Sequence, residues 1–241
     1  TPVMDALAAR GVYTLDGRTV MPSITLPCIT SLFLSSPPQV HHVTTNTWNP
    51  EAPGPGLVEV IHRSGGRAAS FYNWEPLRDL SRPGSLAVGC FLDNCEEPGG
   101  VGDQQLAELA ADYLRREPAD FAFIYLGYTD VAGHRDGWMS PAYIAGIENA
   151  DTCIGRVLAA LEGAWGVIVI SDHGGHEQGH GTESEADMKI PIILSGLDGW
   201  PAGTRLGSGV CITDIAPTIA HSLDIAPPPN WQGRAIMLER G

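Results

Sequence analysis

Short apolar runs recur along the chain, and each one leads directly into polar or glycine-rich sequence. The runs at 121–126 (FAFIYL) and 167–170 (VIVI) are apolar at almost every position, which is typical of a strand buried on both faces of a parallel sheet. Weaker runs predict strands at 67–72, 85–91 and 188–194. Pro191 in the last of these favours an edge or irregular position, because proline cannot donate a ladder hydrogen bond.

Helical periodicity separates these runs. Thr25 precedes Pro27 and is predicted to cap its helix, while Asp103 and Thr213 are predicted to cap two later ones. A polar turn is expected at Asp16–Gly17. Because strands and helices alternate, we predict an α/β fold whose sheet is covered on both faces. The predicted helices span 3–10, 25–34, 57–62, 103–116, 141–162 and 212–221.

Composition narrows the class of protein. The chain has 241 residues, 43% of them hydrophobic and 17% charged, which fits a single globular domain over 1–241. A net charge of −14 disfavours non-specific binding to nucleic acid polymers or to an anionic membrane. No run is long enough to cross a bilayer and none resembles a signal peptide, so the localisation stays open between cytoplasm and export. Five scattered cysteines argue against a disulfide framework, although Cys90 and Cys95 could pair.

The polar sequence after the two strongest strands carries candidate chemistry. Asp130 and His134 follow the first strand, and Asp172, His173 and His180 follow the second. Carboxylates and imidazoles in this number suit zinc or manganese, and five ligands suit two metals that share one site. The alternative is a glycine-rich loop with solvated histidines.

Several motifs together resemble one enzyme family. They are D-x-x-G-H at 130–134, S-D-H-G-G-H at 171–176, H-G-T at 180–182, P-S-I-T-L-P at 22–27 and T-D-I-A-P-T at 213–218. This set resembles the alkaline phosphatase superfamily, and most closely its type I phosphodiesterase/nucleotide pyrophosphatase branch. The resemblance implies an alkaline-phosphatase-like three-layer sandwich with a mainly parallel central sheet. The cap is expected to be reduced, since only 45–102 leaves room for one.

The resemblance also implies roles for individual residues. Asp130, His134 and His180 would hold one metal, and Asp172 and His173 a second, with Zn²⁺ expected at both and Mn²⁺ as the alternative. Thr25 would be the nucleophile, forming a phosphothreonine intermediate. Asn46 would donate a hydrogen bond to a phosphoryl oxygen. His176 has no ligand counterpart and is expected to support a ligand or face solvent.

One expected ligand of the second metal is missing. The family carries an Asp on its first strand, upstream of the helix that here begins near Thr1, and neither Asp5 nor Asp16 matches it. We therefore expect that the chain lacks its natural N-terminus. Removal of a central strand should leave the edges of its neighbours unpaired.

These features predict a metal-dependent hydrolase of phosphodiesters or pyrophosphates of small molecules. A phosphomonoesterase or phosphonate hydrolase on the same metals is the runner-up. Asn46 in place of an arginine clamp favours diesters, although Arg67 or Arg135 could approach. The nucleophile motif disfavours a sulfatase, and the small cap disfavours a phosphomutase. A non-catalytic metal-binding remnant is the alternative from another class.

Overall fold

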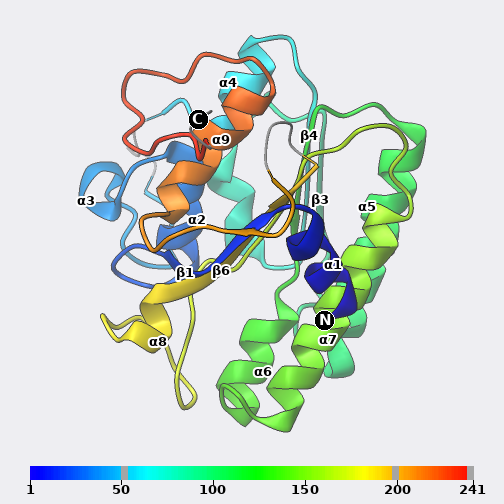
Figure 1. Cartoon of the computed structure of the whole chain (residues 1–241), viewed down its shortest axis with the longest axis vertical. Coiled ribbons are helices and arrows are strands. Elements are labelled where there is room, and N and C mark those ends of the chain that lie inside the picture. The colour runs from blue at the N-terminus through cyan, green and yellow to red at the C-terminus, as the bar shows by residue number, and fades with distance from the viewer. Residues whose placement is uncertain (50–53, 197–200, 238–241) are drawn as a thin grey trace.

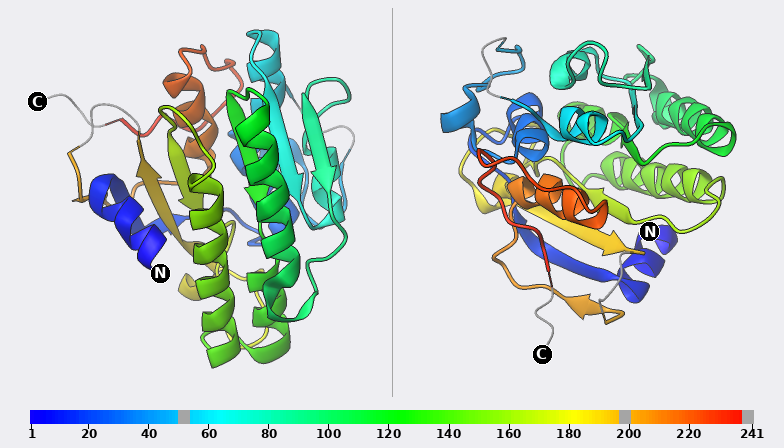
Figure 2. Two further views of the ribbon diagram at one scale, coloured as in Figure 1. Left: turned by 90° about the vertical axis from the view of Figure 1, so that its right-hand side faces the viewer. Right: turned by 90° about the horizontal axis from the view of Figure 1, so that it is seen from above.

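The computed structural model describes residues 1–49, 54–196 and 201–237 of the chain. Two sheets lie between two groups of helices, so that the layered α/β arrangement predicted from the alternating pattern is confirmed (Figure 1; Figure 2). One group contains the long helices α5 and α7, and the other contains α2, α4 and α9. The bounds of these helices and of α1 are Pro2–Arg10 (α1), Thr25–Leu34 (α2), Leu57–Arg63 (α4), Val101–Arg116 (α5), Pro141–Leu158 (α7) and Ile215–Ser222 (α9).

Shorter helical segments complete the description. A helix directly after β4, α6, carries the D-x-x-G-H motif, and α8 precedes the strand β6. No helix among the described residues is long and apolar enough to cross a membrane. The bounds are Pro38–His41 (α3), Tyr128–Asp136 (α6), Glu185–Met188 (α8) and the 3₁₀ turns Glu75–Leu80, Pro98–Gly100 and Ile212–Asp214 (η1 to η3).

Three predicted helix caps are wrong by one to three residues. Ile24 is the N-cap of α2, and Thr25 is its first helical residue. Helix α5 begins at Val101, which places Asp103 in its first turn. The 3₁₀ turn over Ile212–Asp214 makes Asp214 the N-cap of α9, in place of Thr213. The side chains of Thr25 and Asp103 bond to other elements instead, so that local capping signals are outweighed by tertiary contacts.

The strands form a three-stranded sheet in the order β3-β2-β4 and a four-stranded sheet in the order β5-β6-β1-β7. The first is parallel throughout, whereas β6 is antiparallel to both β5 and β1. The parallel pairing expected for 167–170 is therefore wrong. Strand β5 ends at Ile170 and β6 begins at Lys189, so the connection is long enough for either direction of pairing and its length does not explain the antiparallel arrangement. The strands are Val12–Arg18 (β1), Ala68–Tyr72 (β2), Val88–Phe91 (β3), Phe121–Tyr125 (β4), Val167–Ile170 (β5), Lys189–Ser195 (β6) and Thr204–Arg205 (β7).

The polar turn predicted at Asp16–Gly17 is part of strand β1. Its register with β6 shifts between Thr14 and Gly17, which is a β-bulge. A Cβ on Gly17 would lie 2.9 Å from the backbone carbonyl oxygen of Ile190 on β6, so the close approach of the two strands requires glycine. Pro191 lies opposite this bulge and beyond the last residue of β5. The irregular position predicted for this proline is confirmed, but β6 is paired on both sides and is no edge strand.

Strands β4 and β5 are the end strands of the two sheets. Within the described residues neither has a partner on its outer side, and every residue of both is only half-buried despite the apolar sequence. Both edges lead into the sequences that carry the candidate ligands, because Asp130 follows β4 and Asp172 follows β5.

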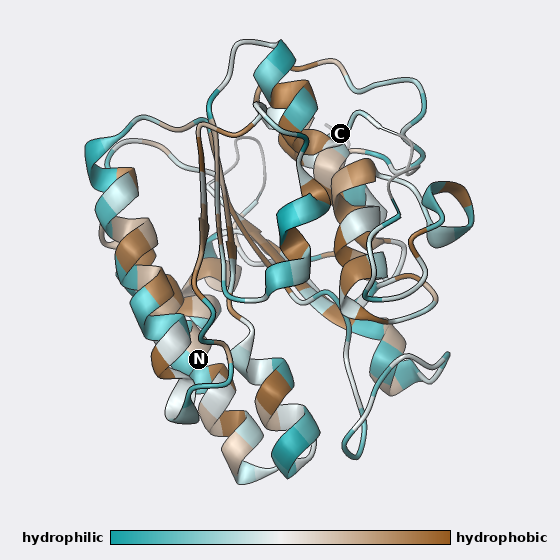
Figure 3. Ribbon diagram, turned by 180° about the vertical axis from the view of Figure 1, so that it is seen from behind, coloured by the Kyte–Doolittle hydropathy of each residue, from teal (hydrophilic) through white to brown (hydrophobic). Residues whose placement is uncertain are grey.

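The largest hydrophobic cluster lies between the sheets and α2, α4 and α9 (Figure 3). In it, Phe33 of α2 packs edge-on against Phe121 and Phe123 of β4, with ring centroids 6.4 and 5.0 Å away. These contacts fix α2 relative to β4, and so fix Thr25 relative to the helix that follows β4.

The segment 45–102, where a reduced cap was expected, forms α4, β2, η1 and β3, so that much of it belongs to the helices and sheets of the core fold. Residues 50–53 of this segment lie outside the described residues. The five cysteines are all free, so Cys90 and Cys95 do not pair.

Candidate metal centre

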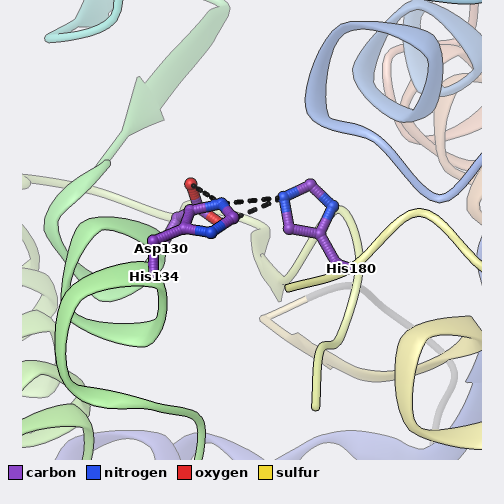
Figure 4. A group of neighbouring side chains, drawn as sticks. All are labelled: Asp130, His134 and His180. Atoms are coloured by element: carbon purple, nitrogen blue, oxygen red, sulfur yellow. Dashed lines mark hydrogen bonds and ion pairs between the residues drawn. The ribbon is translucent and has the colours of Figure 1, made fainter. Parts of the chain in front are cut away.

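The structure gathers the candidate ligands from three segments that are distant in sequence. Asp130 and His134 lie one turn apart on α6, and His180 reaches toward them from the loop after β5 (Figure 4). Asp172 and His173 lie at the carboxyl end of β5. Helix α2 brings Thr25 to the same place. Ligands at the carboxyl ends of strands are typical of open α/β sheets.

Asp130, His134 and His180 have the geometry of a three-ligand metal site. The Nε2 atoms of His134 and His180 are 3.1 Å apart. Asp130 oxygens lie 3.5 Å from the first of these nitrogens and 3.6 Å from the second. Two ligands about 2.0 Å from a tetrahedral zinc would lie about 3.3 Å apart. The spacing therefore fits a tetrahedral ion with one open position.

In each of three histidines, a hydrogen bond at Nδ1 determines which ring nitrogen can bind a metal. The Nδ1 atoms of His134, His173 and His180 lie 2.8–2.9 Å from the carbonyl oxygens of Gln178, Gly174 and Ser23 respectively. A carbonyl can only accept, so each Nδ1 carries the proton and each Nε2 of a neutral ring presents a lone pair. Two such lone pairs facing each other at 3.1 Å would repel, and a cation held between them would remove the repulsion. Carbonyl contacts of this kind are how proteins orient metal-binding histidines.

A second group adjoins the first. His173 Nε2 lies 3.4 Å from Asp172 Oδ2 and 3.9 Å from Asp130 Oδ1. The buried Thr25 hydroxyl donates to the same nitrogen over 3.1 Å. Within the described residues, Asp130 Oδ1 and Asp172 Oδ2 are buried and have no hydrogen-bond partner. Orphaned carboxylate oxygens beside imidazole lone pairs are what a divalent cation would satisfy, and this donor set fits the metals expected from the sequence.

The pKa shifts of Asp172 and His173 have the directions expected beside buried carboxylate charge. Burial raises the pKa of Asp172, and the Asp130 carboxylate adds to the effect. Burial opposes protonation of His173, yet the Asp172 and Asp130 carboxylates raise the pKa of its ring above the usual value. Burial and the neighbouring His173 lower the pKa of His180.

Asn46 lies at the N-terminus of α2, next to Thr25. Its Oδ1 accepts a hydrogen bond from the backbone N–H of Leu26 over 3.0 Å. The amide nitrogen of this exposed side chain is thereby identified as the end that can donate to another molecule. The helix terminus adds free N–H groups and a positive dipole end, so this position suits an anion.

His176, which was expected to support a ligand or face solvent, bonds to Asp187. The distance between His176 Nδ1 and Asp187 Oδ1 is 2.7 Å, and this contact raises the pKa of His176. The fully buried Asp187 also accepts the N–H and the hydroxyl of Thr182 over 2.9 and 2.7 Å. Sequence reasoning missed Asp187, which closes the loop that carries His180. The S-x-x-D pattern from Ser184 is the local signal that could have identified it.

Trp138 is a second residue that sequence reasoning missed. Its ring packs edge-on against His134 and His180, with centroids 5.2 and 5.9 Å away. A Cβ on Gly175 would lie 2.1 Å from this ring, so the second glycine of the D-H-G-G motif makes room for the tryptophan. Trp138 thereby limits the positions that the two histidine rings can adopt.

Comparison with known proteins places the chain in a family. A model of the metalloenzyme superfamily matches residues 99–227, more than half of the chain. The chain belongs to the metalloenzyme superfamily. The matched region contains both strand ends that carry the candidate metal ligands.

Curated relatives include 2,3-bisphosphoglycerate-independent phosphoglycerate mutases. The enzyme of Gloeobacter violaceus is 31% identical over 136 residues, which are 51% of this chain and 25% of the mutase. That of Chloroflexus aggregans is 29% identical over 142 residues, 56% of this chain and 26% of the mutase. The chain thus spans about a quarter of the length of the curated relatives it matches.

Solved structures confirm the alkaline-phosphatase-like fold. Inactive murine ectonucleotide pyrophosphatase/phosphodiesterase 5 in complex with AMP superposes with a TM-score of 0.76 at 13% identity, covering 95% of this chain and 91% of that one. A 2-O GAG sulfatase superposes with a TM-score of 0.73 at 18% identity, covering 98% of this chain and 68% of that one. Because both kinds of enzyme are similar, these structures establish the superfamily fold and do not single out the nucleotide pyrophosphatase branch.

Proposed function

We propose that the protein is a metal-dependent phosphoric ester hydrolase that acts on small-molecule diesters or pyrophosphates, with Thr25 as nucleophile. The observation that carries the proposal is the position of Thr25 Oγ1. It lies at a helix N-terminus, 3.1 Å from His173 Nε2. A hydroxyl placed beside a ligand cluster and an anion-binding helix end is the equipment for displacement at phosphorus.

Five residues would hold two divalent ions, which we expect to be Zn²⁺, with Mn²⁺ as the alternative. Asp130, His134 and His180 would hold one, and Asp172 and His173 the other. Bound there, the ions would supply Lewis-acid charge for an in-line displacement. The lone pair of His173 Nε2 can accept either the Thr25 proton or a metal, so metal binding at this nitrogen would release the hydroxyl from its present hydrogen bond.

The residues of the chain have defined tasks in this proposal. Thr25 Oγ1 gives up its proton to solvent water and forms the bond to phosphorus while the bond to the leaving oxygen breaks, and the leaving oxygen takes a proton from water. A second water then cleaves the phosphothreonine at phosphorus, and the proton that this water loses returns to Thr25 Oγ1. The Asn46 amide donates to a non-bridging oxygen. The N–H groups at the start of α2 stabilise the charge that develops on the phosphoryl group.

The preference for diesters rests on the absence of an arginine clamp among the described residues near Thr25. Arg67 precedes β2, at the end of the parallel sheet opposite to the ligands. Arg135 bonds to Asp136 and to the Tyr128 hydroxyl. The AMP complex of a similar structure supports a nucleotide-like substrate. The mutase relatives are equally compatible with phosphomonoester chemistry, so a phosphomonoesterase or phosphonate hydrolase is the second candidate.

Hydrolysis of bis-p-nitrophenyl phosphate and p-nitrophenyl phosphate, with added Zn²⁺ or Mn²⁺, tests the proposal. We expect Thr25→Ala to abolish turnover and Thr25→Ser to retain part of it. Thr30→Ala is a matched control, because Thr30 is equally buried on the same helix and its hydroxyl has no partner in the described structure. Turnover that survives in Thr25→Ala would refute the nucleophile. Absence of turnover with metal bound would favour the non-catalytic remnant.

A further inference from the structure

Two buried polar side chains contact each other at the start of α6, the helix that carries two of the candidate ligands. Asn73 follows β2, Asp103 lies in the first turn of α5, and both are almost completely shielded from solvent. Asn73 Nδ2 donates to Asp103 Oδ1 over 2.7 Å. Such a pair is expensive to bury, and apolar residues of similar size would fill the same space at lower cost. Its presence therefore calls for a task that apolar side chains cannot perform.

The acceptors of this pair point at the start of α6. Asn73 Oδ1 accepts the N–H of Gly127 over 3.0 Å, and Asp103 Oδ1 accepts the N–H of Tyr128 over 3.4 Å. Helix α6 has no capping side chain of its own, because its N-cap is Gly127. The first N–H groups of a helix need outside partners, and here two other elements provide them.

The position of this contact matters because α6 carries two candidate ligands. Asp130 lies two residues after Tyr128, and His134 lies one turn further along the same helix. No flexible segment separates the anchored N–H groups from these ligands. A Cβ on Gly127 would lie 3.0 Å from Asn73 Oδ1, so the turn is held closely against the pair.

We propose that Asn73 and Asp103 are positioning residues that fix the start of α6 and thereby aim Asp130 and His134 at the metal. This inference rests on the metal centre of the proposed function, and it assigns a role to residues outside that centre. The buried Asp103 Oδ2, which has no partner in the described part of the chain, shows that the site tolerates an unfavourable group in order to keep the acceptor in place.

Zinc affinity of the whole chain, measured by competition with a chromogenic chelator at pH 7.5, tests the inference. We expect Asp103→Ala and Asn73→Ala each to weaken zinc binding at least tenfold. Asp103→Asn keeps an oxygen acceptor and should stay within threefold of the wild type. Leu106→Ala is the control for destabilisation alone, since Leu106 is buried on the same helix and packs on the β2 side chains of the neighbouring core cluster. It should also stay within threefold.

Each outcome decides the matter. Wild-type affinity in Asp103→Ala and Asn73→Ala, or a loss no larger than that of Leu106→Ala, overturns the inference. If Asp103→Ala does not fold, only the zinc affinities of Asn73→Ala and Leu106→Ala are compared, and a loss in Asn73→Ala no larger than that in Leu106→Ala overturns the inference. A wild-type chain that binds zinc but hydrolyses no ester contradicts the proposed function and leaves the positioning role standing. A wild-type chain that binds neither zinc nor manganese overturns both.

Discussion

Replacement of Asp103 by asparagine should change how stability depends on pH. Burial raises the pKa of Asp103 from 3.8 to about 6, even though the bonds from Asn73 and Tyr128 oppose the shift. The folded chain therefore holds this proton to higher pH than the unfolded chain, and ionisation of the side chain destabilises the fold. With ~1.36 kcal/mol for each unit of pKa difference, the penalty above pH 6 is about 3 kcal/mol.

The sign of the effect is opposite to that of a salt-bridged carboxylate. Asp103 contributes no penalty well below pH 3.8, and the penalty grows as the pH rises through the interval between the two pKa values. About 2 kcal/mol of it develops between pH 4.5 and pH 7.5. Asparagine does not titrate. The free energy of unfolding of Asp103→Asn, minus that of the wild type, should therefore rise by about 2 kcal/mol between pH 4.5 and pH 7.5.

Urea unfolding followed by tryptophan fluorescence, with a chelator present to remove bound metal, gives the required difference at each pH. Subtraction of the wild-type curve removes the contributions of the other titrating groups. Asp112→Asn, at an exposed position of the same helix, is measured in parallel as the control for the amide substitution itself. A difference for Asp103→Asn that stays flat to within about 0.5 kcal/mol would refute the reasoning that Asp103 is desolvated.

Three further substitutions, with His176→Ala as a control, probe the centre itself. His180→Ala should remove about one zinc per chain by elemental analysis and abolish ester hydrolysis, whereas His176→Ala should keep the metal; equal zinc content in both variants would contradict the assignment of ligands. Gly175→Ala places a Cβ 2.1 Å from the Trp138 ring and should destabilise the fold by about 1–3 kcal/mol in urea unfolding, so an unchanged midpoint would show that the ring can move away. Asn46→Ala should lower kcat/KM for the diester by about 10²-fold, as expected for loss of one donor to a developing oxyanion, and an unchanged value would remove Asn46 from the mechanism.

Local sequence was enough to determine the types of element and the types of ligand. Apolar runs of four to six residues predicted β4 and β5 at their observed positions, and the polar residues after them supplied carboxylates and imidazoles at the strand ends. The start signal of Thr25 followed by Pro27 located α2 correctly between Thr25 and Leu34. These features depend on neighbours within one helical turn or one strand, and so they can be recognised along the chain.

The direction of strand pairing could not be predicted in the same way. An apolar run such as 167–170 is equally compatible with parallel and antiparallel neighbours, and only its register with β6 in the folded sheet shows that the pairing is antiparallel. The bulge at Gly17 also depended on the partner strand, because the contact that requires glycine is made by the backbone of Ile190. Sequence reasoning about Asp16–Gly17 described a preference of the dipeptide, and tertiary pairing outweighed it.

The tertiary structure alone decided how the centre is supported. The Nε2 lone pair of His180 is free because Ser23, 157 residues away in sequence, accepts its Nδ1 proton. Asn73 and Asp103 meet the start of α6 from two other elements, and no spacing along the chain links these residues. The identity of a ligand is a property of a single residue, and the sequence displays it directly. The tautomer of a histidine, and the burial and orientation of a ligand side chain, depend on groups that only folding brings together.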